Sequence, residues 1–196
     1  MVVDAALWSG CYRNFTGYIN FNGNECYAEN ADFELLKSGS ILWRCGIWRG
    51  GIWEKGEWHN GTWYGETWND GIWCNGEWFT GIWHDGIWRN GTFLNGIWKE
   101  GLWRSGKWEG GTWMDGIHEN GTWNGGHWHN GIWENGVWND GTWRDGDWND
   151  GEWKCGKWIT GKQHIMYWKS DRSYYFREWR KTDSPPLMRR DRYIDV

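Results

Sequence analysis

The sequence predicts an all-β repeat protein, and two phases of a five-residue period carry that prediction. Trp recurs every five residues from Trp43 to Trp158 and fills 22 of the 24 positions in that phase. Gly fills 23 of the 24 positions that lie two residues ahead of the Trp phase. Self-similarity at a fixed period is the signature of a repeat architecture, so residues 43–162 are expected to form one small unit copied many times.

Each five-residue unit predicts a short strand and a corner. We number the slots so that Gly opens the unit and Trp is third. The second slot is mostly β-branched or aliphatic, as in Ile47 and Thr62, which strands prefer. The fourth slot is mostly polar or charged, as in Arg49 and Glu54. The fifth slot is Asn, Asp or Gly in 17 of 24 cases, and these residues build turns.

Two flanking regions are predicted to cap the array. Residues 1–42 are an N-terminal capping or assembly region, in which Ala31-Asp32-Phe33 is in phase with the later units, Ala in the Gly slot and Phe in the Trp slot. Residues 163–196 leave the repeat. Within them, the apolar runs 165–168 and 174–176 flank a polar stretch and predict a β-hairpin.

The last thirteen residues, 184–196, are expected to be an extended tail, because Ser184-Pro185-Pro186 breaks the chain. The tail is too short to build its own core, so we expect its apolar and basic residues to dock on a neighbouring subunit or another protein, by strand addition. The candidate partner-binding residues are Leu187, Met188, Arg189, Arg190, Arg192, Tyr193 and Ile194.

Two folds are open to such an array. One is an antiparallel meander, since Asn-Gly and Asp-Gly recur and favour hairpin turns. The run 133–138 is similar to tryptophan-zipper hairpin peptides, and Gly-x-Trp-x-x-Gly resembles part of the MORN motif, which implies paired hairpins. Parity favours the other fold, a β-solenoid, because a strand with two-residue loops at both ends needs an even number of residues and this unit leaves three.

The solenoid interpretation resembles the pentapeptide-repeat family, a quadrilateral β-helix whose unit is a small residue, Asp or Asn, Leu or Phe, and two variable residues. Ala31-Asp32-Phe33 fits that unit; elsewhere Gly replaces Ala and Trp replaces Leu or Phe. The resemblance implies four sides per coil, six coils, and each Trp above the Trp twenty residues earlier. Gly and Trp are both expected to point inward. The candidate structural core comprises Trp43, Trp48, Trp53, Trp58, Trp98, Trp103, Trp138, Gly46, Gly96 and Gly136.

No catalytic group recurs in the array, so the sequence favours a non-enzymatic structural protein without a cofactor. Gly-x-Trp-x-x arrays resemble those encoded among bacteriophage virion genes, which implies a decoration, tail or baseplate component located in the virion, with other virion subunits or itself as partner. The first alternative is a carbohydrate-binding module with outward Trp faces stacking on glycans. The second, a DNA-mimicking topoisomerase inhibitor, needs a strongly acidic surface, which 11 basic against 16 acidic residues in 43–162 do not favour.

Composition limits the partners and the compartment. The net charge is −5, and a mildly acidic array does not favour nucleic acid as a partner. No run of apolar residues predicts a membrane span, and the first residues lack the features of a secretory signal. Free thiols are therefore expected for the five cysteines, although a Cys11–Cys26 bridge is open.

A few positions depart from the repeat. His118 fills a Trp slot and is expected to be a buried ring with one hydrogen bond rather than a catalytic base. Glu66, the exception in the Gly phase, follows Gly65 and is expected to turn away from the core at a local bulge. His127 and His129 share an outward face but lack a third metal ligand, so surface slots are the better interpretation. The carboxylates that cluster near the end of the array are likewise expected at corners and on the surface: Asp145, Asp147, Asp150 and Glu152.

Overall fold

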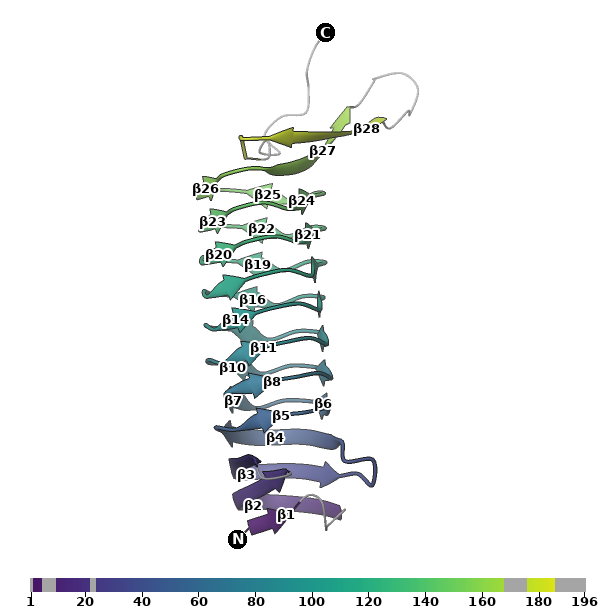
Figure 1. The fold of residues 1–196 in the computed structure, drawn as a ribbon, viewed down its shortest axis with the longest axis vertical. Coiled ribbons are helices and arrows are strands. Elements are labelled where there is room, and N and C mark those ends of the chain that lie inside the picture. Colours follow the sequence, from purple (N-terminus) through teal and green to yellow (C-terminus); the bar gives the residue numbers. More distant parts are fainter. Residues whose placement is uncertain (1, 5–9, 22–23, 168–175, 186–196) are drawn as a thin grey trace.

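The protein is a straight shaft of stacked coils with a cap at each end (Figure 1). The structure is a computed structural model, and it describes residues 2–4, 10–21, 24–167 and 176–185. All regular elements in the described residues are β-strands. Strands of the array pair only in parallel with strands of the neighbouring coils, which confirms the solenoid and excludes the antiparallel meander.

One coil contains fifteen residues, so the shaft has three sides per coil rather than the four that were expected. Ile82 pairs with Ile97, and Trp83 with Trp98, fifteen residues on. The 24 pentads therefore make about eight coils instead of six. Each Trp lies above the Trp fifteen residues earlier, not twenty.

The sharp corners and the large rings account for three sides. A triangle turns more at each corner than a square does, and the chain makes this turn at glycines with positive φ, such as Gly96 at 132° and Gly126 at 105°. Inside, three indoles per coil already meet edge to face, as Trp98 and Trp103 do with centroids 5.8 Å apart. A fourth side would move rings of this size apart and open the centre of the shaft.

We name the three sides by their central rings: face I runs from Trp43 to Trp148, face II from Trp48 to Trp153 and face III from Trp53 to Trp158. Face I consists of the start of β4 (Ile41–Arg49), then β6 (Gly56–Trp58), β9 (Ile72–Trp73), β12 (Ile87–Trp88), β15 (Leu102–Trp103), β18 (Ile117–His118), β21 (Ile132–Trp133) and β24 (Asp147–Trp148). Face II consists of the end of β4, then β7 (Thr62–Tyr64), β10 (Glu77–Trp78), β13 (Thr92–Phe93), β16 (Lys107–Trp108), β19 (Thr122–Trp123), β22 (Val137–Trp138) and β25 (Glu152–Trp153). Face III consists of β5 (Ile52–Trp53), β8 (Thr67–Trp68), β11 (Ile82–Trp83), β14 (Ile97–Trp98), β17 (Thr112–Trp113), β20 (His127–Trp128), β23 (Thr142–Trp143) and β26 (Lys157–Trp158).

The interior of the shaft is three columns of stacked rings. Most Trp pairs fifteen residues apart have centroids 4.7–4.9 Å apart and nearly parallel planes, as in Trp83–Trp98 at 4.7 Å and 4°. Offset stacking of this kind adds about 0.5–1.5 kcal/mol per pair beyond burial. The sequence prediction of a buried Trp stack is therefore confirmed.

The N-terminal cap is an antiparallel meander. The strands β2 (Gly10–Phe21) and β3 (Asn24–Leu35) pair with each other, β3 pairs with β4, and β1 (Val2–Asp4) pairs in parallel with β2. Phe33 stacks on Trp43 at 5.5 Å and Tyr12 stacks on Phe33 at 4.8 Å, so the face I column continues into the cap. The Ala31-Asp32-Phe33 pentad, although in phase, lies on an antiparallel strand and is not a further coil.

The C-terminal cap is the predicted hairpin. The strand β27 (Gly161–Tyr167) pairs in parallel with β24 and antiparallel with β28 (Phe176–Thr182), which confirms the hairpin. The indole N–H of Trp158 donates to the carbonyl of Thr182 at 2.9 Å, and the Gln163 side-chain amide donates to the Ser184 carbonyl. The first bond ties the hairpin to the last coil of rings, and the second ties Ser184 to the hairpin.

Candidate functional site

The ring core is the dominant feature that the residues build. In the part of the chain that the structure describes, every Trp of the array is at most 8% exposed. The expected core tryptophans are all fully buried: Trp43, Trp48, Trp53, Trp58, Trp98, Trp103 and Trp138. Backbone bonds between coils hold the rings in register, as Lys99 N–H does when it donates to the Trp83 carbonyl at 2.8 Å.

The glycines are required for a different reason from the one expected. Gly46, Gly96 and Gly136 have φ values of 116°, 132° and 129°, which L side chains rarely adopt. A Cβ on Gly96 would collide with the carbonyl of Gly81, one coil below, and not with the Trp98 ring. The Gly slot is thus a corner where successive backbones touch. The ring that borders it is that of the preceding unit, as Trp133 is for Gly136 at 3.1 Å, and not the Trp of its own unit.

Asn and Asp in the fifth slot have a role that the sequence did not reveal. The Asn95 Oδ1 accepts a hydrogen bond from the Gly96 N–H at 2.9 Å, and Asp115 does the same for Gly116 at 2.7 Å. Asn120, Asp140 and Asp150 repeat the contact at other corners. The fifth slot therefore supplies an acceptor for the corner amide as well as tolerating the turn.

The corner at Glu66 has its own geometry. Glu66 is exposed, so the expectation that it turns away from the core is confirmed. Gly65 is buried instead, with no room for a Cβ against the Trp63 ring. The N–H groups of Glu66 and Thr67 both lie near the Gly51 carbonyl, at 3.0 and 3.4 Å. The turn glycine has moved back by one residue.

His118 is buried within the face I column, as expected, but the expected hydrogen bond is not formed. It stacks on Trp133 at 3.9 Å and lies 6.0 Å from Trp103. Neither ring nitrogen has a hydrogen-bond partner in the described residues. Burial lowers the pKa of His118 to about 3, against the opposing effect of backbone groups of His118 and Asn135. The ring is therefore neutral at physiological pH and has no contact with solvent.

The other titratable candidates do not converge. His127 and His129 lie on face III, where burial first, then Arg144 and His127, lower the pKa of His129. The Asp145 and Asp150 carboxylates accept bonds from the glycine that follows each. Asp147 pairs with Lys162 at 3.5 Å on face I. Within the described ranges, no group of three His, Cys, Asp or Glu residues is placed to hold a metal ion.

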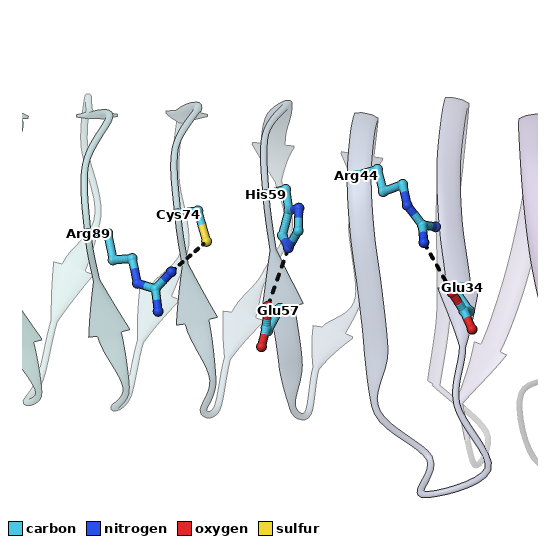
Figure 2. Close-up of polar contacts among 6 residues, drawn as sticks. All are labelled: Glu34, Arg44, Glu57, His59, Cys74 and Arg89. Carbon is cyan, nitrogen blue, oxygen red and sulfur yellow. Dashed lines mark hydrogen bonds and ion pairs between the residues drawn. The ribbon is translucent and has the colours of Figure 1, made fainter.

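The five cysteines are free, so the Cys11–Cys26 bridge is not formed. Cys26 is buried and its Sγ lies 3.6 Å from the Ile19 carbonyl; burial raises the pKa of this thiol. Cys74 lies on face I, where the Arg89 guanidinium approaches its Sγ at 3.7 Å. Figure 2 shows Arg44, His59, Cys74 and Arg89 in a row, one coil apart.

A shallow depression at the corner between faces I and II is lined by polar side chains, among them Asn60, Asn75 and Glu77. No helix in the described residues is long and apolar enough to cross a bilayer. The candidate partner-binding residues 187–194 lie outside the described residues, so their docking stays a prediction. Comparison with models of protein families, with curated proteins and with solved structures found no match for the chain.

Proposed function

We propose that this protein is a non-enzymatic structural protein, a rigid spacer in a multi-subunit assembly. The observation that carries the proposal is the continuity of the three ring columns over about eight coils. Bending such a shaft would separate stacked rings on its outer side, and the loss would be repeated at each coil. A filled, stiff shaft with capped ends is suited to holding two partners at a fixed distance.

Duplicating one coil tests the spacer. A second copy of residues 82–96 keeps the fifteen-residue register and should lengthen the particle by about 4.8 Å, the spacing of paired strands. Small-angle X-ray scattering of variants with one, two and three added coils measures the increment. A maximum dimension that fails to grow linearly would contradict a rigid shaft.

We further propose that the assembly is a bacteriophage virion, with the protein as a decoration, tail or baseplate component. What supports this is the resemblance of the Gly-x-Trp-x-x array to arrays encoded among bacteriophage virion genes, since the geometry of the shaft supports only a spacer. Mass spectrometry of purified particles tests it, with a non-structural protein of the same infected cell as the control. Recovery of the chain at a fixed copy number per particle is expected; its loss on purification would contradict the proposal.

The carbohydrate-binding alternative lacks the exposed Trp faces that it requires. It required outward Trp faces, and the array tryptophans are buried. The outward aromatic residues on face II do not replace them, because Tyr64 and Phe79 stack on each other at 4.4 Å and Arg49 lies over the Tyr64 ring at 5.1 Å. The ring faces that a sugar would need are therefore largely occupied.

A further inference from the structure

Face I carries an unbroken column of aliphatic side chains on its outer surface. These residues occupy the second slot of five successive coils: Ile72, Ile87, Leu102, Ile117 and Ile132. All are partly exposed, and Ile117 reaches 39%. On face II the second slot has no such column, because polar residues such as Glu77 and Lys107 occupy it. A continuous apolar stripe on a flat sheet is the kind of surface that marks an interface.

A column of charges runs beside this stripe in the fourth slot, and its order is unusual. Arg89 and Arg104 lie on adjacent coils, and Glu119 and Glu134 follow on the next two. All four side chains are exposed. Like charges are thus neighbours twice, which is unfavourable in an isolated shaft. In the same slot of face II no like charges are adjacent, and Asn124 there donates to Glu109 at 2.9 Å one coil below.

The side chains of the central pair of this column have no partner among the described residues. The side chains of Arg104 and Glu119 form no ion pair or hydrogen bond with any described residue, and only their backbone N–H groups are bonded, to the coil before. Glu134 accepts one bond, from Asn149 at 2.8 Å, and Arg89 lies against the Cys74 sulfur. A second chain could therefore approach the middle of the column without displacing an existing contact there.

The order Arg, Arg, Glu, Glu is complementary to its own reverse. We propose that face I is the interface of an antiparallel homodimer, with the two-fold axis across the shaft between the coils of Leu102 and Ile117. Rotation about such an axis reverses the order of the coils, but each slot of one copy still faces the same slot of the other. Arg104 then faces Glu119 of the second copy, and Arg89 faces its Glu134. The same operation sets the aliphatic column on its counterpart, Leu102 on Ile117 and Ile87 on Ile132.

One pair of charges near the ends of face I agrees with this symmetry. Glu57 in the second coil is matched with Lys162 of the second copy, again opposite charges. Cys74 is matched with Asn149, whereas Ile72 meets Asp147, whose carboxylate pairs with Lys162 of its own chain. A parallel arrangement of the two shafts lacks this agreement, because its axis would bring the aliphatic slot of one copy onto the charged slot of the other.

The size of the face indicates a reversible dimer. Eight coils at ~4.8 Å and five residues at ~3.3 Å give roughly 600 Å² per copy. Stable complexes commonly bury about 800 Å² per partner, so the dimer is expected to dissociate in the micromolar range. The shaft is straight in Figure 1, which keeps the two columns in register over several coils. This dimer does not depend on the proposed structural role, and either can fail without the other.

A charge swap tests the pairing. Sedimentation equilibrium of the full chain, from about 1 to about 200 µM, measures the dimer constant. Arg104→Glu places Glu opposite Glu119 twice and should weaken the dimer at least about tenfold, as should Glu119→Arg. The double variant R104E/E119R restores opposite charges and should return the constant to near the wild-type value. Lys99→Glu, an exposed change on face III, is the matched control. A wild type that stays monomeric overturns the proposal, and so does a dimer that the single variants leave unchanged.

A thiol-crosslinking test fixes the register. Asn149→Cys is combined with the native Cys74, with Cys11, Cys45 and Cys155 replaced by Ser. Five coils separate positions 74 and 149 within one chain, about 24 Å at ~4.8 Å per coil, whereas facing sheets lie about 10 Å apart. A short bis-maleimide, which spans the second distance but not the first, should therefore give a covalent dimer that peptide mapping assigns to the 74–149 pair. The same variant with Cys74→Ser should not form it. Failure to crosslink under conditions where the wild type is dimeric would overturn the antiparallel register.

Discussion

At the scale of the residue, each slot of the pentad has one physical task. The third slot supplies a ring to a column, and the first slot supplies a backbone with positive φ at a point of contact with the coil below. The fifth slot supplies an acceptor to the corner amide. The sequence predicted the buried rings, because the aromatic period is explicit. The task of Gly was not predictable from side-chain volumes, since it depends on how closely two successive corners approach.

Replacing Gly96 by Val should destabilise the protein strongly. A left-handed backbone costs about 1–2 kcal/mol for an L residue, and overpacking against the Gly81 carbonyl costs about 1–3 kcal/mol more. Urea unfolding followed by Trp emission measures the loss. Lys99→Glu, three residues away on an exposed slot, is the control and should change stability by less than about 0.5 kcal/mol. Equal losses for the two variants would contradict the corner assignment.

His118 should make stability depend on pH. Its folded pKa of about 3 lies below the ordinary value, so between about pH 6.5 and 3 the unfolded chain binds a proton that the folded chain does not. The His118 contribution to the free energy of unfolding is therefore fully present well above pH 6.5, and it is lost as the pH drops through this window. The loss from pH 7.5 to pH 5 should be about 2 kcal/mol.

His118→Phe, which keeps a ring in the column, isolates this contribution. Phe93 already occupies an equivalent position on face II, stacked on Trp108 at 4.2 Å. The unfolding free energy of the variant should lose about 2 kcal/mol less than that of the wild type over the same pH range. Parallel curves for the two proteins would show that His118 is solvated rather than buried.

At the scale of the element, the five-residue side and the C-terminal hairpin follow from local sequence. The C-terminal hairpin was predicted from two apolar runs around a polar stretch, and its strands pair as Tyr167 with Phe176. The N-terminal pentad misled in part, because a slot pattern shows which residues point inward but not the direction of the strand. Ala31 and Phe33 are indeed buried, on a strand that runs antiparallel to β4.

The C-terminal tail should be dispensable for folding and required for assembly. The Ser184 carbonyl accepts from Gln163 in the cap, so the test deletion is 186–196 rather than a cut at 184. Circular dichroism and the urea midpoint of the truncated chain should match those of the full chain, since the ring columns are untouched. Binding to the assembly, measured by co-sedimentation with particles, should be lost. A truncated chain that assembles as well as the full one would contradict a docking role.

At the scale of the whole molecule, the sequence predicted a solenoid and could not give its number of sides. All pentads are nearly alike, so a period of five is compatible with coils of fifteen or twenty residues. The number of sides depends on the corner angle and on how three or four indoles fill the cross-section. A five-residue pattern determines neither of these. The charge order on face I becomes readable only once the fifteen-residue step is known, which is why the sequence did not reveal it.

The three-sided coil is tested most directly by engineered disulfides on the outward fourth slot. Lys99 and Met114 lie fifteen residues apart, and both are exposed on face III of adjacent coils. Lys99 and Glu119 lie twenty residues apart, on different faces. In a background in which the native cysteines are replaced by Ser, the pair K99C/M114C should oxidise to an intramolecular disulfide, because paired strands lie within about 5 Å. The pair K99C/E119C should stay reduced; crosslinking of that pair in place of the first would contradict three sides and show a twenty-residue coil.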